Sequence, residues 1–410
     1  MACNGIFLLC LGTFCLLTVI ITITTFITAP EYHSKTHNKD SQNLLNHGSS
    51  SSDFYNIRRY SSNKEITTKI SPDSVPNLRL KLQSYAEKDE TSAIPAFYNG
   101  TLYYPTWGGY IKAVNILGGS IIWKKSLKEL AGLDNSTRFV VDLTVSRTTP
   151  TIACDLLIVG IYGPAVVVAV NRSTGELVWS TQLSSNAASV ITMSGTYYQG
   201  SFYIGTSCLE ESLSIQQFEY CCTFRGSFFK LNAQTGAVSW QTFMLPDNGG
   251  ETGEYAGAAI CGSSPSIDKC RNLVYIAAGD LYSAPLRIRQ CHEQQNNQTT
   301  TTCNIIKCVE PEDYSNSIMA LDLDFGKIKW FRKLGGWFFV YCNNELSILN
   351  CRSEPRPDLN EFSEAPMVLR DIDYPNGTKR DVVFVLQQRT GFALALDRDY
   401  GDILWYKPGE

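Results

Sequence analysis

The sequence has almost no histidine outside its first fifty residues. Three of its four histidines are His33, His37 and His47, so that His292 alone remains for the rest of the 410 residues. Hydrolysis by a Ser-His-Asp or Cys-His arrangement requires an imidazole that the fold places beside a nucleophile, and histidine-ligated zinc requires several. The scarcity of histidine therefore argues against both kinds of chemistry.

Charge is also scarce. Asp, Glu, Lys and Arg make up 18% of the residues, the formal net charge is −4, and no run of Lys and Arg with interleaved aromatic residues occurs. A protein that binds nucleic acid needs such a basic surface, so nucleic acid is not expected as a partner. A small molecule, a polymer or another protein remains open.

The N-terminal segment lacks charge altogether between residues 4 and 30. Residues 1–30 are either a signal peptide or an anchor that spans the membrane with residues 6–28, and the small-residue site at Ile27-Thr28-Ala29 favours cleavage. Residues 31–72 are rich in Ser, Asn, Lys and His and are predicted to be a disordered polar linker. The folded domain is expected to occupy residues 73–410, with membrane contact only if the N-terminal segment stays uncleaved.

Cysteine, by contrast, is abundant, with 14 residues, of which three lie in the N-terminal apolar segment. The remaining eleven are an odd number, so at least one is a free thiol or bonds another chain. Together with five sequons they favour a eukaryotic glycoprotein of the secretory pathway, located outside the cell, in the apoplast or in a vacuole. The sequons begin at Asn99, Asn135, Asn171, Asn297 and Asn376.

One pattern recurs five times without a change in spacing: Asn or Asp, three residues, Gly, three residues, Trp. The side chain of Asn or Asp closes a turn by bonding the main chain two residues on, and Gly supplies the positive φ that ends a hairpin. Each copy therefore predicts a β-hairpin whose indole packs against the neighbouring repeat. The copies are Asn115-Gly119-Trp123, Asn171-Gly175-Trp179, Asn232-Gly236-Trp240, Asp322-Gly326-Trp330 and Asp397-Gly401-Trp405.

The intervals between successive tryptophans of the pattern are 56, 61, 90 and 75 residues. These intervals are too long for the turns of a solenoid and fit four-stranded propeller blades that carry insertions. The 21 Tyr and 19 Phe residues also suit sheets better than helices. The predicted fold is therefore all-β, a β-propeller with about five blades present.

Five longer stretches resemble the plant branch of the polyvinyl-alcohol-dehydrogenase-like proteins. That group is similar to the alcohol dehydrogenases that depend on pyrroloquinoline quinone (PQQ), whose fold is an eight-bladed propeller of tryptophan-docking repeats. The resemblance covers residues 71–410 and implies that this chain lacks the C-terminal blades, leaving an incomplete ring. The stretches are Gly160-Ile161-Tyr162-Gly163-Pro164-Ala165, Met193-Ser194-Gly195-Thr196, Cys221-Cys222-Thr223-Phe224-Arg225-Gly226, Leu245-Pro246-Asp247-Asn248-Gly249-Gly250 and Gly262-Ser263-Ser264-Pro265-Ser266-Ile267-Asp268.

The resemblance implies a metal site. Gly279-Asp280-Leu281 resembles the family's Gly-Asn-Pro, whose Asn binds calcium, so that Asp280 is a candidate ligand for a hard cation. Glu211, with Glu210, is a candidate for the second carboxylate of that site. The alternatives are an aspartate that caps the turn after a strand and a pair of glutamates in an exposed loop.

The resemblance also implies catalytic residues. Arg389 resembles the basic residue that contacts the oxygens of the quinone, where a fixed cation stabilises negative charge on the reduced cofactor. The acidic base that takes the alcohol proton has no clean match, and Asp358, Glu361 and Glu364 are the nearby carboxylates. A solvated arginine in a turn is the alternative for Arg389.

Three further cofactor contacts come from the resemblance. Cys221 and Cys222 are adjacent, and the dehydrogenases hold a vicinal disulfide against PQQ; two separate bridges to distant cysteines are the structural alternative. Arg225 follows this pair. Cys261 stands where the family has the tryptophan that forms the floor beneath PQQ.

The function that follows is an oxidoreductase that transfers hydride from an alcohol, small or polymeric, to PQQ held with calcium in the propeller. The alternatives are a non-catalytic secreted propeller that binds protein or glycan, and a truncated inactive relative.

Overall fold

The computed structural model describes most of the predicted propeller domain. The described residues are 71–80, 90–133, 144–210, 222–297 (with the main chain alone in 292–297), 310–334, 366–373, 377–386 and 393–407. The predicted N-terminal leader and all but the last two residues of the predicted linker lie outside them. No helix among the described residues is long and apolar enough to cross a membrane.

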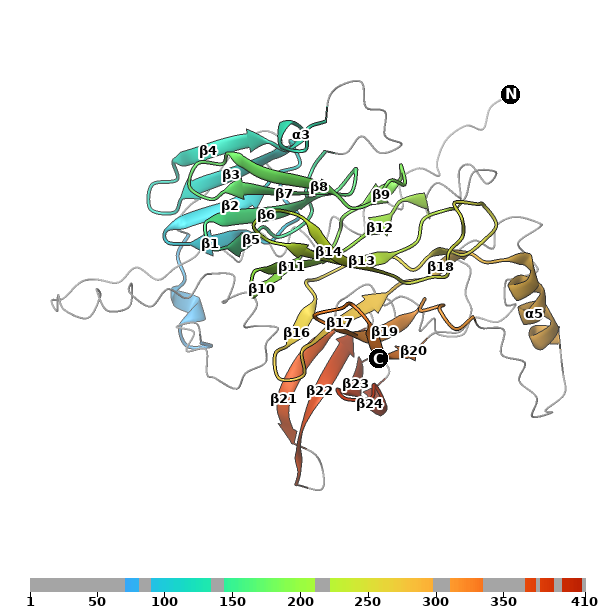
Figure 1. Cartoon of the computed structure of the whole chain (residues 1–410). Helices are drawn as coiled ribbons and strands as arrows, with labels where there is room; N and C mark the ends of the chain where they lie inside the picture. The colour runs from blue at the N-terminus through green and yellow to red at the C-terminus, as the bar shows by residue number, and fades with distance from the viewer. Residues whose placement is uncertain are drawn as a thin grey trace, which may run out of the picture.

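Five four-stranded antiparallel sheets, here called blades 1 to 5, follow one another along the chain, each with its strands in sequence order. Figure 1 shows the series from the cyan first blade to the red fifth blade. Blade 1 comprises β1 (Ala96–Tyr98), β2 (Thr101–Pro105), β3 (Tyr110–Asn115) and β4 (Ile121–Ser126). Blade 2 comprises β5 (Thr151–Ala153), β6 (Leu156–Ile161), β7 (Val166–Asn171) and β8 (Leu177–Gln182). Blade 3 comprises β10 (Thr196–Tyr198), β11 (Ser201–Gly205), β13 (Ser227–Asn232) and β14 (Val238–Phe243).

Blade 4 comprises β16 (Ser266–Asp268), β17 (Leu273–Ala278), β19 (Ser317–Asp322) and β20 (Ile328–Lys333). Blade 5 comprises β21 (Met367–Asp373), β22 (Lys379–Leu386), β23 (Ala393–Asp397) and β24 (Ile403–Lys407). The first strand of each blade faces the shared centre, because β5 contacts both β1 and β10, and β16 contacts β21. The predicted propeller architecture is therefore confirmed.

The repeated turn forms as predicted. In blade 2, Asn171 Oδ1 accepts hydrogen bonds from the main-chain N–H of Ser173 at 2.9 Å and of Thr174 at 3.2 Å. Gly175 then adopts a φ of +73°, which L-residues with a side chain rarely adopt, and its N–H donates to the Asn171 carbonyl. A β-bulge between Ala169 and Val170 accommodates the turn.

Each of the first four repeat tryptophans docks on the turn of the following blade. The indole lies over the glycine of that turn, where a Cβ on Gly175 would come within 2.8 Å of the Trp123 ring. Glycine is therefore required by packing as well as by backbone conformation. The indole Nε1 donates to a main-chain carbonyl of the same turn: Trp123 to Arg172 at 3.0 Å, Trp179 to Ala233 at 2.9 Å, Trp240 to Leu323 at 3.2 Å and Trp330 to Arg398 at 3.0 Å.

The hydrophobic core consists of apolar layers between neighbouring blades. Trp123 packs with Leu157 and Val168 between blades 1 and 2, and Trp179 packs with Phe229 between blades 2 and 3. Fully burying one such aliphatic side chain contributes about 1.5–3 kcal/mol. Inner strands such as β6 and β17 are buried along their whole length, so that each of these blades packs on its neighbours with both faces.

The connections between blades and those between the second and third strands lie at one end of the propeller, because the strands alternate in direction. We call this the connection end, and the end with the repeated turns the turn end. At the connection end β9 (Ser189–Val190) pairs with β12 (Ser207–Cys208), and β15 (Ala256–Gly257) pairs with β18 (Leu281–Ser283).

Within the described ranges, three helices interrupt the all-β pattern: η1 (Val75–Asn77), α3 (Leu127–Leu130) and α5 (Leu286–Asn297). The polar residues from Gln290 to Thr302 favour a surface loop by their composition, but residues 290–297 continue α5. The helix starts after Pro285, carries no internal Gly or Pro, and is anchored where Ile288 enters the core beside blade 4.

Candidate functional site

The connection end of blades 3 and 4 holds the sequence-predicted site residues that the structure describes. Residues 256–260, here called the bridging segment, run between the two blades. On the blade 3 side, Gly257 N donates to the Phe224 carbonyl and Gly226 N donates to the Gly257 carbonyl, both at 2.8 Å. A Cβ at Gly226 would overlap the Ala258 carbonyl, so this close approach requires glycine.

The bridging segment is bonded to blade 4 as well. Ala258 N donates to the carbonyl of Asp280 at 2.6 Å, and Gly279 N donates to the carbonyl of Ala259 at 2.9 Å. The segment leads directly to Cys261. The main chain therefore brings Cys222, Arg225, Cys261 and Asp280 to the same end of the propeller.

Arg225 is held by its own blade. Its Nη2 lies 2.9 Å from Asp247 Oδ1, its Nη1 donates to the Leu245 carbonyl at 3.3 Å, and its guanidinium lies 4.0 Å from the centre of the Phe243 ring. The side chain is only 16% exposed. The Arg225 side chain thus lies against the end of β14 and the residues that follow it, and Asp247 balances its charge.

Glu210 fastens the connection end of blade 3. Its Oε2 accepts from the N–H groups of Thr223 and Phe224, both at 2.9 Å, and its Oε1 accepts from Asn186 Nδ2 at 2.7 Å. The Thr223 hydroxyl donates to Oε1 at 3.2 Å. Both carboxylate oxygens therefore bind groups of the protein itself, which assigns Glu210 a structural role.

Asp280 follows β17, and its side-chain Oδ1 is shielded from solvent. The backbone on either side is fixed, because Asn316 N donates to the Gly279 carbonyl at 2.9 Å. Carboxylate oxygens are the kind of ligand that calcium prefers. Within the residues that the structure describes, no group of three His, Cys, Asp or Glu side chains could hold a metal ion together.

Cys222 is fully buried among Phe224, Ala256 and Tyr282. It is disulfide-bonded, but the vicinal pairing stays a prediction because Cys221 lies outside the described residues. Cys261 is half-buried. The other predicted site residues also lie outside the described residues; they are Glu211, Asp358, Glu361, Glu364 and Arg389.

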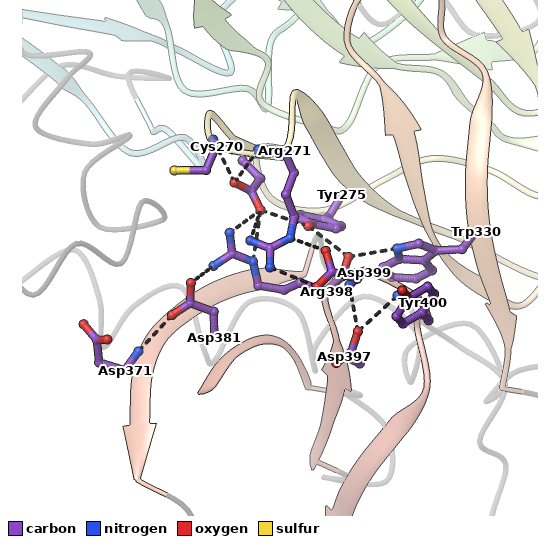
Figure 2. Close-up of polar contacts among 11 residues, drawn as sticks. Cys270, Arg271, Tyr275, Trp330, Asp371, Asp381, Asp397, Arg398, Asp399 and Tyr400 are labelled. Carbon is purple, nitrogen blue, oxygen red and sulfur yellow. Dashed lines mark hydrogen bonds and ion pairs between the residues drawn. The ribbon is translucent and has the colours of Figure 1, made fainter. Parts of the chain in front are cut away.

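A buried charged network that the sequence analysis did not single out joins blades 4 and 5 at the turn end (Figure 2). Asp268 Oδ2 accepts from Arg398 Nε at 3.0 Å and from the Tyr275 hydroxyl at 3.1 Å. Arg398 also pairs with Asp381. Arg398 directly follows Asp397 of the fifth repeat, a position that holds Ile116, Arg172, Ala233 and Leu323 in the other copies. Because the second copy also has an arginine there, no signal in the sequence distinguishes Arg398.

A second ion pair lies beside that network. Arg271 donates from Nη2 to Asp399 Oδ2 at 3.1 Å, and this contact holds the pKa of Asp399 below its usual value. Burial raises the pKa of Tyr275, so its hydroxyl stays protonated as the donor to Asp268. The charges in this network are paired across the blade interface, which indicates a structural role.

The chain resembles several known proteins. A family model named PQQ_2, described as outer membrane protein assembly factor BamB, matches residues 79–332. A polyvinylalcohol dehydrogenase from a Pseudomonas species is 24% identical over 320 residues, which are 75% of this chain and 43% of that protein. A quinohemoprotein alcohol dehydrogenase from Comamonas testosteroni is 21% identical over 333 residues, which are 76% of this chain and 40% of that protein. The chain thus spans less than half the length of these relatives.

Solved structures share the fold. The crystal structure of quinohemoprotein alcohol dehydrogenase from Comamonas testosteroni superposes with a TM-score of 0.53 at 17% identity, covering 79% of this chain and 43% of that chain. A europium-containing methanol dehydrogenase superposes with a TM-score of 0.51 at 16% identity, covering 77% of this chain and 50% of that chain. The similarity is thus to propellers of the alcohol dehydrogenase type.

Proposed function

Since this chain belongs to the PQQ_2 family, whose model is described as outer membrane protein assembly factor BamB, we propose that it is an oxidoreductase that oxidises an alcohol with PQQ and calcium. The observation that carries the proposal is the connection end, where the bridging segment holds Asp280, Arg225 and the Cys222 region in one place. Relatives named as alcohol dehydrogenases support the substrate class.

The described residues fit the metal part of this proposal at one position. Asp280 offers a carboxylate whose Oδ1 is shielded from solvent and whose backbone is fixed by Ala258, which suits a hard cation. Glu210 does not fit as a second ligand, because its oxygens already accept four hydrogen bonds. The second carboxylate is proposed to be Glu211.

PQQ, when bound, accepts two electrons and two protons from an alcohol, which becomes a carbonyl compound. In this chain Arg389 would balance the charge on the reduced cofactor, and Asp358 or Glu364 would take the hydroxyl proton of the alcohol. Cys261 would offer a smaller contact surface beneath the ring than the tryptophan that the resemblance implies, while Arg225 would act by positioning the loop that carries Cys222.

The test uses the full chain with PQQ and Ca²⁺. Binding is measured by the absorbance of PQQ and by thermal shift, and turnover by dye reduction with polyvinyl alcohol and with small secondary alcohols. Asp280→Asn should abolish the calcium-dependent thermal shift. The matched control is Asp155→Asn, which removes a carboxylate that is 94% exposed at the turn end and should leave the shift unchanged. Absence of any thermal shift and of dye reduction in the wild type would contradict the proposal.

A second function is favoured by the engagement of Arg225 and Glu210 within the protein. A propeller whose connection end is tied by its own side chains is suited to bind protein or glycan without catalysis. This second function predicts that PQQ leaves the melting temperature unchanged, and that a glycan array identifies a glycan to which the protein binds with saturation. A truncated inactive relative would give neither result.

The N-terminal segment and the sequons extend the proposal to location. We propose that the chain enters the secretory pathway and is released after cleavage near Ala29, with retention by residues 6–28 as the alternative. N-terminal sequencing of the secreted protein would separate the two outcomes.

A further inference from the structure

Four of the five repeat tryptophans are docked on a following blade, and the fifth is not. Trp123, Trp179 and Trp330 are only 7%, 7% and 8% exposed, whereas Trp405 is 39% exposed. Among the described residues, no carbonyl accepts a hydrogen bond from Trp405 Nε1. Trp405 therefore presents the donor half of a contact that the molecule makes four times elsewhere.

The face around Trp405 is built like the docked faces. Register places Phe384 opposite Ala395, and Ala395 opposite Trp405, so these three side chains share one side of blade 5. The rings of Phe384 and Trp405 are 5.9 Å apart between centres, as are those of Tyr275 and Trp330 in the docked blade 4. The open face is thus already shaped to receive a repeated turn.

The docked contact has a third component besides the indole N–H and the glycine. The residue two positions after each tryptophan reaches the same turn of the next blade. In blade 5 that position is Lys407. The contacts are Lys125 Nζ to Glu176 Oε1 at 2.6 Å, Thr181 Oγ1 to the Gly236 carbonyl at 2.8 Å, Thr242 Oγ1 to the Gly326 carbonyl at 2.7 Å and Arg332 Nε to the Gly401 carbonyl at 2.8 Å.

The acceptor half of the contact is open in blade 1. The turn at residues 115–119 is fully formed, with Asn115 Oδ1 accepting from Leu117 N at 2.9 Å and Gly119 at a φ of +70°. Leu117 is 81% exposed, and Gly119 is partly exposed, whereas the equivalent glycines of the four docked turns are buried. None of the docked indoles lies on this turn, because each of them occupies the turn of blade 2, 3, 4 or 5.

We propose that Trp405 of one copy docks on the turn at residues 115–119 of a second copy of this chain. The indole N–H would donate to the Ile116 carbonyl, and the ring would cover Gly119. Blades 1 and 5 lie apart within one copy (Figure 1), so the contact is made between copies. It is a head-to-tail contact, which joins two different surfaces and is independent of any cofactor chemistry.

The test measures the mass of the full chain in solution by sedimentation velocity over a range of concentrations. The wild type is expected to associate, and Trp405→Ala should weaken association at least tenfold. Trp405 is partly exposed, so an unchanged melting temperature shows that the variant still folds. The matched control is Tyr406→Ala. Tyr406 is 64% exposed and pairs with Leu394 in the register of the sheet. Its side chain therefore lies on the other face of the sheet from Trp405, so association should not change.

A wild type that stays monomeric at all concentrations, or association that Trp405→Ala leaves unchanged, would overturn the proposal. So would a monomer in which Trp405 is protected from quenching, since the indole would then dock within its own copy.

Discussion

Arg398 of blade 5 donates from Nε to Asp268 Oδ2 of blade 4 at 3.0 Å, with both side chains shielded almost completely from solvent. The Asp268 carboxylate also accepts hydrogen bonds from the Tyr275 hydroxyl and from the main-chain N–H of Cys270, so both of its oxygens are hydrogen-bonded. At the corresponding positions, the Arg172 guanidinium lies 3.8 Å from the centre of the Tyr98 ring between blades 1 and 2, and Ala153 packs in one cluster with Ala233 between blades 2 and 3. The buried ion pair of blades 4 and 5 therefore adds to the apolar packing around Trp330 that these two blades also share.

Asp268→Ala should destabilise the protein by about 3–5 kcal/mol, because it leaves the Arg398 guanidinium buried beside a single half-exposed carboxylate. Urea denaturation measures the change. Arg271→Ala is the control: Arg271 is 30% exposed and should cost about 1 kcal/mol or less. Equal losses of unfolding free energy in the two variants would show that the burial of the Asp268–Arg398 pair does not determine its contribution to stability.

Gly236→Ala should lower the melting temperature well beyond the loss from Gly200→Ala. Both glycines have positive φ, +72° and +76°, so both substitutions strain the backbone. A Cβ at Gly236 would also come within 2.5 Å of the Trp179 ring, whereas nothing lies near a Cβ at Gly200. The extra loss, about 1–3 kcal/mol for overpacking, isolates the docking contact. Equal melting temperatures would argue against a tight fit of indole on glycine.

Asp399 is expected to stabilise the protein in a pH-dependent way. Its pKa is lowered in the folded state, chiefly by the hydrogen bond from Arg271. The folded state therefore binds its proton less readily than the unfolded state, so the contribution is complete above the ordinary aspartate pKa of about 3.9 and disappears as pH falls through the lower folded value. Because the side chain is 50% exposed, the contribution should be about 1 kcal/mol or less.

The measurement compares the free energy of unfolding of the wild type and Asp399→Asn from neutral pH down to about pH 3. The difference should be constant near neutral pH and shrink in acid. A difference that grows in acid would reverse the sign and rule out the Arg271 contact as its cause.

Asn99 should carry a glycan when the chain is secreted from eukaryotic cells, and Asn171 should not. Asn99 is exposed at the tip of the turn between β1 and β2. Asn171 uses its Oδ1 to close a repeated turn on which Trp123 is docked through the Arg172 carbonyl, which leaves little room for a sugar. Peptide mass mapping with and without deglycosylation reads both sites. A bare Asn99 in secreted protein would contradict the prediction.

The repeated turns were predictable from sequence because each is a local event. The Asn or Asp, the glycine and the tryptophan lie within nine residues, and their spacing alone determines turn, bulge and the direction of the indole. Each docked indole donates to a carbonyl in the next copy of the same pattern, so the docking partner could be predicted as well. Helix α5 could not, since it depends on the burial of Ile288 beside blade 4.

The candidate site was less predictable, because its side chains are shared between segments distant in sequence. Asp280 was singled out through a resemblance alone, and its role as a metal ligand stays a prediction. Arg225 was singled out for a cofactor, while its partner Asp247 lies beyond β14, a pairing that no local pattern reveals. The Asp268–Arg398 pair spans 130 residues and became visible only when blades 4 and 5 were brought together.

The bridging segment has a consequence for the relative motion of blades 3 and 4. Its main chain is bonded to Phe224 and Gly226 on one side and to Gly279 and Asp280 on the other, so these two blades cannot separate at the connection end without breaking several of these bonds. Blades 3 and 4 are therefore expected to exchange their amide hydrogens here only through a joint opening of both blades.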